Sequence, residues 1–192
     1  MSVEVAVRRS VALLFLLCAS SSFGQKYVGS SADSTSVESA DVGEIDDLTL
    51  VTSDGHSIKA PKISAQVAFD RPIFSPDARR VIWAALVPFS GTSYPIPTAL
   101  VIFRGNKIER VIREDQCIFQ VMFAEHGSAI AYYTSALHFD LGKTAHLRRL
   151  SDGKEIGRYE IPGGAPDTIN EEKDAALKSA PQWVRDINRI DL

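Results

Sequence analysis

Short apolar or alternating segments, separated by turn residues, follow one another from about Leu48 to Gly163. They read LTLV, HSIKAPKI, AQVAF, RRVIWAAL, TALVIF, IERVI, CIFQVMF, SAIAYYT, AHLRRL and EIGRYEI. Such segments are typical of β-strands, and Asp-Gly or Gly-Asn pairs between several of them suit tight hairpins. We expect hairpin turns at Ser53–Gly55, Arg104–Lys107 and Ser151–Lys154. The pattern therefore predicts an all-β, antiparallel domain over residues 48–163.

This strand pattern repeats along the chain. FSPDARRVIWA from Phe74 aligns without a gap on FAEHGSAIAYY from Phe123, 49 residues later. LTLVTSDGHSIKAPKI from Leu48 aligns on HLRRLSDGKEIGRYEI from His146, at twice that spacing. A repeat built from four short strands is typical of a β-propeller blade. The predicted fold is all-β, with about two and a half propeller-like, four-stranded antiparallel blades and a short C-terminal helical tail.

The turn at the start of the repeat carries a family resemblance. The segment 71–85, RPIFSPDARRVIWAA, resembles the Pro-Asp propeller repeat of TolB-like and WD-like β-propeller proteins, many of which are secreted or periplasmic. The residues that match are Phe74, Ser75, Pro76 and Asp77, with Ala78 in place of the usual glycine and Arg79 and Arg80 in the basic positions. The second copy keeps only Phe123 and Gly127. The resemblance implies blades and gives Asp77 a structural role in the turn, but it implies no particular activity.

The number of blades raises a question of closure. Closed propellers have about 4–8 blades, more than this chain supplies. The sheets could pack face to face as an open pair, several chains could close a ring through the exposed blade edges, or the chain could be a fragment of a longer ancestor. We expect the open pair for the monomer and keep homo-oligomers as an alternative.

The pattern becomes helical in the last segment, residues 164–192. Asn170 can cap a helix that runs through EEKDAALKS, and Pro181 interrupts it. The tail beyond carries apolar residues at helical spacing, namely Trp183, Val184, Ile187 and Ile190. We expect this face to dock on an open sheet edge, and the alternative is a partner-binding tail.

The first 24 residues have the three parts of a cleavable signal peptide. Two arginines precede an apolar run from Val11 to Ala19, and small residues lead to an expected cut near Gly24/Gln25. The run is shorter than the roughly 20 residues of a membrane span. The mature protein is therefore expected to be secreted or periplasmic with no membrane span; a buried hydrophobic helix is the alternative. Leu17 stands where a lipobox needs a small residue, so lipidation of Cys18 is not expected.

Residues 25–47 are rich in Ser, Asp and Glu and poor in large apolar residues. Such a segment buries too little to offset its ordering entropy, so the sequence predicts a flexible leader with the folded part starting near Leu48. Removal of Cys18 with the signal peptide leaves Cys117 as the single cysteine, so no intrachain disulfide can form. We expect the Cys117 thiol to be buried within its strand.

Charge and motifs give little evidence for chemistry. The chain has 21 Lys+Arg and 24 Asp+Glu, a net charge of −3. This mildly acidic balance is not polarised along the sequence, so no nucleic-acid partner is expected. The four histidines have no close metal-ligand spacing, and P-loop, GxSxG and GxGxxG motifs do not occur. We predict no catalytic residue, metal site or cofactor. The alternative is a secreted hydrolase or metal-dependent enzyme that uses the loop residues His138 and Asp140.

The loops between second and third strands are the best candidates for recognition. In the first copy this loop, LVPFSGTSYPIP, carries Phe89 and Tyr94 between prolines, and in the second copy SALHFDLGK carries His138 and Asp140. Exposed aromatic residues in a proline-stiffened loop suit binding, although they could instead tuck under the loop as a small apolar cluster. The sequence therefore favours a non-enzymatic module for protein or cell-envelope interaction, with a truncated, inactive propeller as a further possibility.

Overall fold

The computed structural model describes residues 25–28, 37–42, 47–136, 142–163 and 169–189, which form three four-stranded antiparallel sheets and two helices. The N-terminal sheet contains β1 (Gln25–Val28), β2 (Val37–Val42), β3 (Leu48–Thr52) and β4 (Ser57–Lys59). The central sheet contains β5 (Ala68–Phe74), β6 (Arg80–Val87), β7 (Ile96–Arg104) and β8 (Lys107–Arg113). The C-terminal sheet contains β9 (Cys117–Ala124), β10 (Ala129–Ser135), β11 (Lys143–Arg149) and β12 (Glu155–Ile161).

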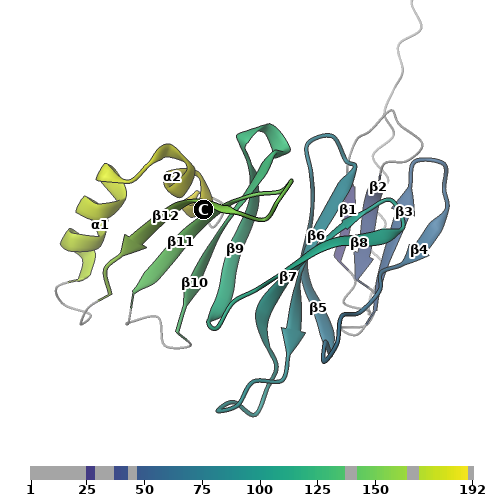
Figure 1. Cartoon of the computed structure of the whole chain (residues 1–192), viewed down its shortest axis with the longest axis horizontal. Coiled ribbons are helices and arrows are strands. Elements are labelled where there is room, and N and C mark those ends of the chain that lie inside the picture. The colour runs from purple at the N-terminus through teal and green to yellow at the C-terminus, as the bar shows by residue number, and fades with distance from the viewer. Residues whose placement is uncertain (1–24, 29–36, 43–46, 137–141, 164–168, 190–192) are drawn as a thin grey trace, which may run out of the picture.

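Each sheet is a simple meander, in which strands that follow one another in sequence pair as neighbours. Figure 1 shows the three sheets standing in a row, with the helices at the C-terminal end. The predicted all-β, propeller-like arrangement of four-stranded blades is confirmed, and the described sheets do not close into a ring.

The N-terminal sheet corrects the expectation of a flexible leader over residues 25–47. Strand β2 pairs with β3, with Val42 opposite Leu48, and β1 pairs with β2. The half blade expected from the sequence is therefore a full four-stranded sheet. Backbone hydrogen bonds support these strands, from β3 to β2 and from β2 to β1, whereas our sequence argument counted only their few large apolar side chains.

The central sheet is buried on both faces, and this explains its continuous apolar segments. Along β6, Val81 and Trp83 pack with Leu48 and Leu50 of the N-terminal sheet, and all four side chains have no exposed area. The intervening Ile82 faces the C-terminal sheet instead. Successive side chains on a strand point to opposite faces, so a strand with two covered faces carries no polar alternation. Sheets pack face to face as expected, but there are three of them rather than a pair.

The helical tail covers the outer face of the C-terminal sheet. Helix α1 (Ile169–Ser179) begins one residue before Asn170, and α2 (Gln182–Asn188) begins after Pro181. Val184 and Ile187 have no exposed area and belong to a cluster with Ala129, Ala131, Tyr133, Ala145 and Leu147 of the sheet.

The tail therefore docks on a sheet face, and the expected docking on a sheet edge is wrong. The small side chains of Ala129, Ala131 and Ala145 leave room for α2 to approach the face. The hydroxyl of Tyr133 donates to the Val184 carbonyl over 3.0 Å. Ile190 lies outside the described residues. Within the described ranges, neither helix is long and apolar enough to cross a membrane.

Candidate recognition surface

The loop between β6 and β7 is closed by its own hydrogen bonds. The Thr92 N–H donates to the Phe89 carbonyl over 3.2 Å, and the Thr92 hydroxyl donates to the Tyr94 carbonyl over 2.6 Å. Pro88 and Pro95 frame this turn. Because proline fixes φ, these residues restrict the conformations of the loop before any partner binds.

The loop surrounds a hollow of about 210 Å³, which we call the tyrosine hollow. Its lining residues are Val67, Pro88, Phe89, Thr92, Ser93, Tyr94 and Pro95. Tyr94 is 59% exposed and Val67 is 38% exposed, whereas Phe89 is half-buried.

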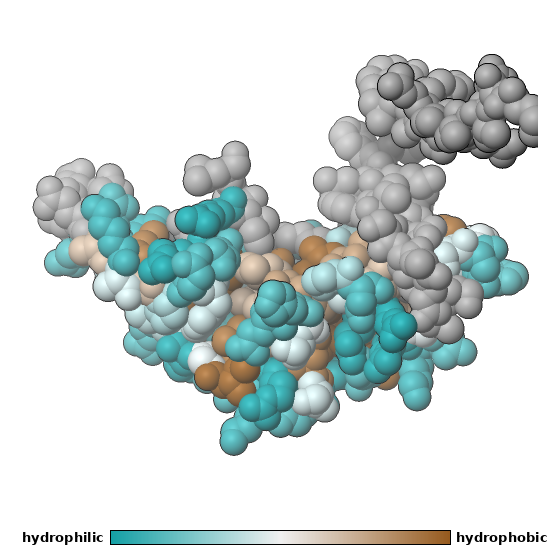
Figure 2. All heavy atoms as spheres, turned by 90° about the horizontal axis from the view of Figure 1, so that it is seen from above, coloured by the Kyte–Doolittle hydropathy of each residue, from teal (hydrophilic) through white to brown (hydrophobic). Residues whose placement is uncertain are grey.

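Large exposed hydrophobic side chains are concentrated in the tyrosine hollow. Among the described residues there are three of them, and the third, Ile156 at 36%, lies on β12. Figure 2 shows a mainly hydrophilic surface on the face seen from above, with hydrophobic residues visible only in small patches. Two of these three residues, Val67 and Tyr94, line the same small hollow, which is unusual for this surface.

The far wall of the tyrosine hollow is fixed to the central sheet. The Val67 N–H donates to the Leu86 carbonyl over 2.9 Å, and Lys62 Nζ donates to the Val67 carbonyl over 2.8 Å. Val67 is thus tied to the end of β6, the strand that leads into the loop. Hydrogen bonds therefore fix both sides of the hollow, the β6–β7 loop on one side and Val67 on the other.

The structure brings two of the four candidate binding residues together. Phe89 and Tyr94 line the same hollow, and their role in binding stays a prediction. His138 and Asp140 lie outside the described residues. In Figure 1 the β6–β7 loop and the C-terminal end of β10 lie at the same, lower end of their sheets.

A buried polar cluster between the central and C-terminal sheets was not anticipated from the sequence. Thr134 Oγ1 lies 2.9 Å from His146 Nε2, and His146 Nδ1 lies 2.7 Å from Glu155 Oε2. This is the connectivity of a nucleophile, base and acid relay. However, Thr134 and His146 are each only 4% exposed, so a substrate cannot reach the hydroxyl. We interpret the cluster as structural.

Tyr132 extends this cluster towards the central sheet. Its hydroxyl donates to Glu114 Oε1 over 2.5 Å and accepts from Arg148 Nε over 2.7 Å. Its ring stacks on the His146 ring, with 5.1 Å between the ring centroids. Burial, followed by the Glu114 carboxylate, raises the pKa of Tyr132. The sequence did hold a signal, because His146 and Arg148 are two residues apart on β11 and so share a face.

The remaining chemistry-bearing residues serve the fold. Asp77 Oδ1 accepts from the Ser75 hydroxyl over 2.6 Å and from the Arg79 N–H over 3.2 Å, which is the turn role that the resemblance implies. Partial burial raises the pKa of Asp77, but these hydrogen bonds outweigh it, so the pKa is lowered from its ordinary value. Cys117 is buried, as expected. In the described part of the chain, no group of three His, Cys, Asp or Glu side chains is placed to hold a metal ion.

Comparison with solved structures gives remote likenesses, one of which is to a β-propeller domain. No family model matches the chain, and no curated protein matches it. The chain is similar to the crystal structure of the β-propeller domain of Cps50 (Swd1) from Myceliophteria thermophila, with a TM-score of 0.49 and 11% identity. The match covers 73% of this chain and 44% of that one, so this chain spans less than half of that domain's length.

Proposed function

We propose that this protein is a secreted or periplasmic, non-enzymatic interaction module that binds a protein or cell-envelope component through the tyrosine hollow. The observation that carries the proposal is the pairing of Tyr94, 59% exposed, with Val67, 38% exposed, across one small hollow. The three stacked sheets supply a rigid support for that loop. The described residues include no accessible catalytic constellation that would favour an enzyme.

The chemistry of the tyrosine hollow suits recognition. A tyrosine presents a large apolar ring and a polar hydroxyl, and such residues dominate the energetics of many interfaces. The Thr92 hydrogen bonds and the flanking prolines hold Tyr94 in place in the free protein. The loop therefore loses little conformational entropy when a partner binds.

Two features of the sequence support the proposed location. Residues 1–24 have the basic, apolar and small-residue parts of a signal peptide. The Phe74–Asp77 turn resembles that of TolB-like repeats, which supports a place among secreted or periplasmic propeller-like proteins. Intact mass of the protein recovered from its host tests the location, because cleavage leaves a chain that starts at Gln25, the first residue of β1.

Photo-crosslinking in the native host tests the binding site. We would place p-benzoyl-phenylalanine at Tyr94 and, as a matched control, at Ile156, the exposed hydrophobic residue outside the hollow. We expect one defined product from position 94 that position 156 does not give. Equal or absent products at both positions would rule out the tyrosine hollow as a contact, and a product containing two copies of this chain would replace a foreign partner with self-association.

A further inference from the structure

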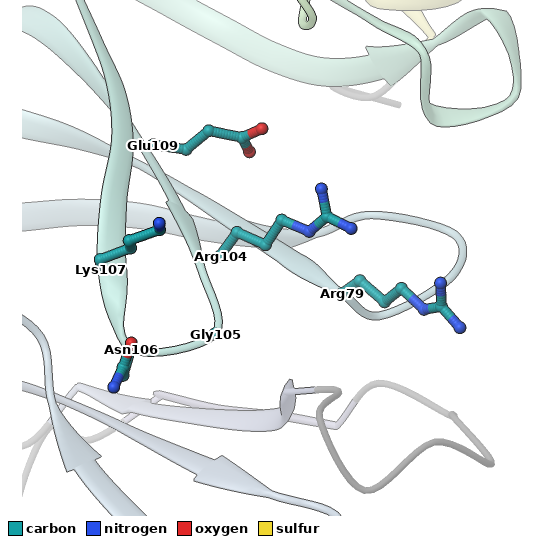
Figure 3. Close-up of a pocket in the computed structure, with 6 residues that line it drawn as sticks. All are labelled: Arg79, Arg104, Gly105, Asn106, Lys107 and Glu109. Carbon is teal, nitrogen blue, oxygen red and sulfur yellow. The ribbon is translucent and has the colours of Figure 1, made fainter.

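A second hollow lies at the opposite end of the central sheet from the tyrosine hollow. Its volume is about 500 Å³, and we call it the basic hollow. Its lining residues are Arg79, Arg104, Gly105, Asn106, Lys107 and Glu109 (Figure 3). Three of these side chains are cations and one is a carboxylate, although the chain as a whole is slightly acidic.

The strand register places the cations in a row. Arg104 on β7 is directly opposite Arg80 on β6 and directly opposite Lys107 on β8. Residues directly opposite one another on paired strands share a face of the sheet. Figure 3 shows Arg104 and Lys107 on the two strands that flank the turn, with Arg79 projecting from the neighbouring turn. The fold therefore gathers like charges that repel one another, an arrangement that an anion would relieve.

The single carboxylate of the basic hollow is already engaged. Glu109 accepts two hydrogen bonds from Arg80, Nε to Oε2 at 2.7 Å and Nη2 to Oε1 at 3.2 Å. This ion pair lowers the pKa of Glu109, and Arg104 adds to the effect through its charge. Within the described residues, the side chains of Arg104 and Lys107 make no hydrogen bond or ion pair. They are exposed and available to a ligand.

The basic hollow also departs from the chain's own repeat. The two other hairpins between third and fourth strands carry a carboxylate in the turn, Asp54 and Asp152. Asp152 pairs with Arg149 at 3.1 Å and accepts from the Lys154 N–H at 3.0 Å, so it neutralises the local cation. The central hairpin has Gly105 and Asn106 instead. Its excess positive charge comes from that difference.

The turn itself leaves space for a ligand. Gly105 has φ +63°, and a Cβ atom built there would meet nothing within 4 Å. The backbone is therefore open at the turn between the two cations. A ligand group could approach the main chain as well as the side chains.

We propose that the basic hollow binds the phosphate group of a small phosphate monoester, held chiefly by Arg104 and Lys107. The planar guanidinium of arginine matches two phosphate oxygens at once, and lysine adds a compact charge. Arg79 also lines the hollow, but the nearby Asp77 carboxylate offsets part of its charge, so it is not counted among the main ligands. A hollow of about 500 Å³ exceeds a single phosphate and has room for an attached sugar. This proposal is independent of the tyrosine hollow.

Titration followed by ¹H–¹⁵N NMR tests the proposal, with inorganic phosphate and glucose 6-phosphate as probes and ionic strength held constant with sodium chloride. We expect saturable shifts of the Gly105 and Asn106 amide signals with one or both probes. Tighter binding of glucose 6-phosphate would identify a phosphate ester as the ligand class, and equal affinities would identify the phosphate group alone. No saturable shift at these amides with either probe would overturn the proposal.

Variants at matched hairpins separate a site from general screening. Arg104→Gln with Lys107→Gln, and separately Asn106→Asp, should weaken binding at least ten-fold, since the second change restores the carboxylate of the other turns. Arg149→Gln with Lys154→Gln removes the same charge from the C-terminal sheet and should leave the affinity within two-fold. An equal loss in both double variants would contradict a specific site. A circular dichroism spectrum of each variant checks that it is folded.

Discussion

Gly127 lies directly against Pro76: a Cβ atom built on Gly127 would stand 3.1 Å from Pro76 Cδ. Gly127 and Ala78 are 49 residues apart and occupy the same place in the two repeats, with φ of +88° and +51°. The turns that carry the family resemblance are therefore also one of the places where the central and C-terminal sheets touch. The repeat sets both the shape of each turn and the contact between turns.

We predict that Gly127→Ala destabilises the protein by about 1–2 kcal/mol, because alanine is strained at positive φ and its methyl group meets Pro76. Urea denaturation at pH 7 measures the change. Ala78→Gly is the reciprocal control: it relieves strain and loses a buried methyl group, so the free energy of unfolding should change by less than about 1 kcal/mol. Equal stability of Gly127→Ala and wild type would show that the turn relaxes freely.

The helical tail should contribute strongly to stability. Ile187 has no exposed area and packs on the C-terminal sheet, so Ile187→Ala should cost about 2–4 kcal/mol. The exposed Lys178 on α1 is the control, and Lys178→Ala should stay within about 0.5 kcal/mol of wild type. Thermal unfolding followed by circular dichroism distinguishes the two. A small effect of Ile187→Ala would mean that the tail is not part of the cooperative fold.

Tyr132→Phe should destabilise the protein by about 1–2 kcal/mol. The change removes a hydroxyl that joins Arg148 of the C-terminal sheet to Glu114 in the connection between the central and C-terminal sheets, and both partners then lose a hydrogen bond. Tyr94→Phe removes an exposed hydroxyl and should leave the free energy of unfolding unchanged. If the two variants unfold at the same urea concentration, the hydrogen bonds of the Tyr132 hydroxyl do not contribute to stability.

The Arg80–Glu109 pair predicts a pH dependence of stability. The folded state lowers the pKa of Glu109 below the ordinary 4.5, so the unfolded state takes up a proton first as pH falls. The pair's contribution is complete above that ordinary value and is lost as pH falls through the lowered pKa. Glu109→Gln should therefore lose about 1 kcal/mol at pH 7 and little at pH 2.

Urea denaturation of wild type and Glu109→Gln across pH 2–7 measures this difference. The two free energies of unfolding should converge at the acid end. A constant gap over the whole range would mean that the effect of Glu109→Gln is steric and not ionic.

The sequence predicted the architecture well where apolar patterning and the repeat acted together. The strands ending near Phe74 and Phe103 and the second copy up to Ile161 match β5, β7 and β12. Strands β1 and β2 were missed because backbone pairing supports them, β2 with β3 and β1 with β2, and amino-acid composition does not reveal such pairing. The apolar face of the tail was predicted, but the surface on which it packs was not. That surface is made by three alanines of the C-terminal sheet that lie far from the tail in sequence.

The candidate sites also differ in how far the sequence reveals them. Phe89 and Tyr94 could be singled out because aromatic residues between prolines stand out within one loop. The basic hollow depends on the register that sets Arg104 opposite Arg80 and Lys107. The buried cluster depends on contact between Arg148 on β11 and Glu114 in the β8–β9 connection. Sequence spacing alone does not reveal contacts of that kind.

The affinity for the partner captured by crosslinking at position 94 tests the central claim most directly. Isothermal titration with the purified partner would compare wild type, the double variant Phe89→Ala with Tyr94→Ala, and the control Ile156→Ala. We predict at least a ten-fold weaker Kd for the double variant, with its Tm unchanged, and wild-type affinity for Ile156→Ala. Wild-type affinity in the double variant would contradict recognition through the tyrosine hollow.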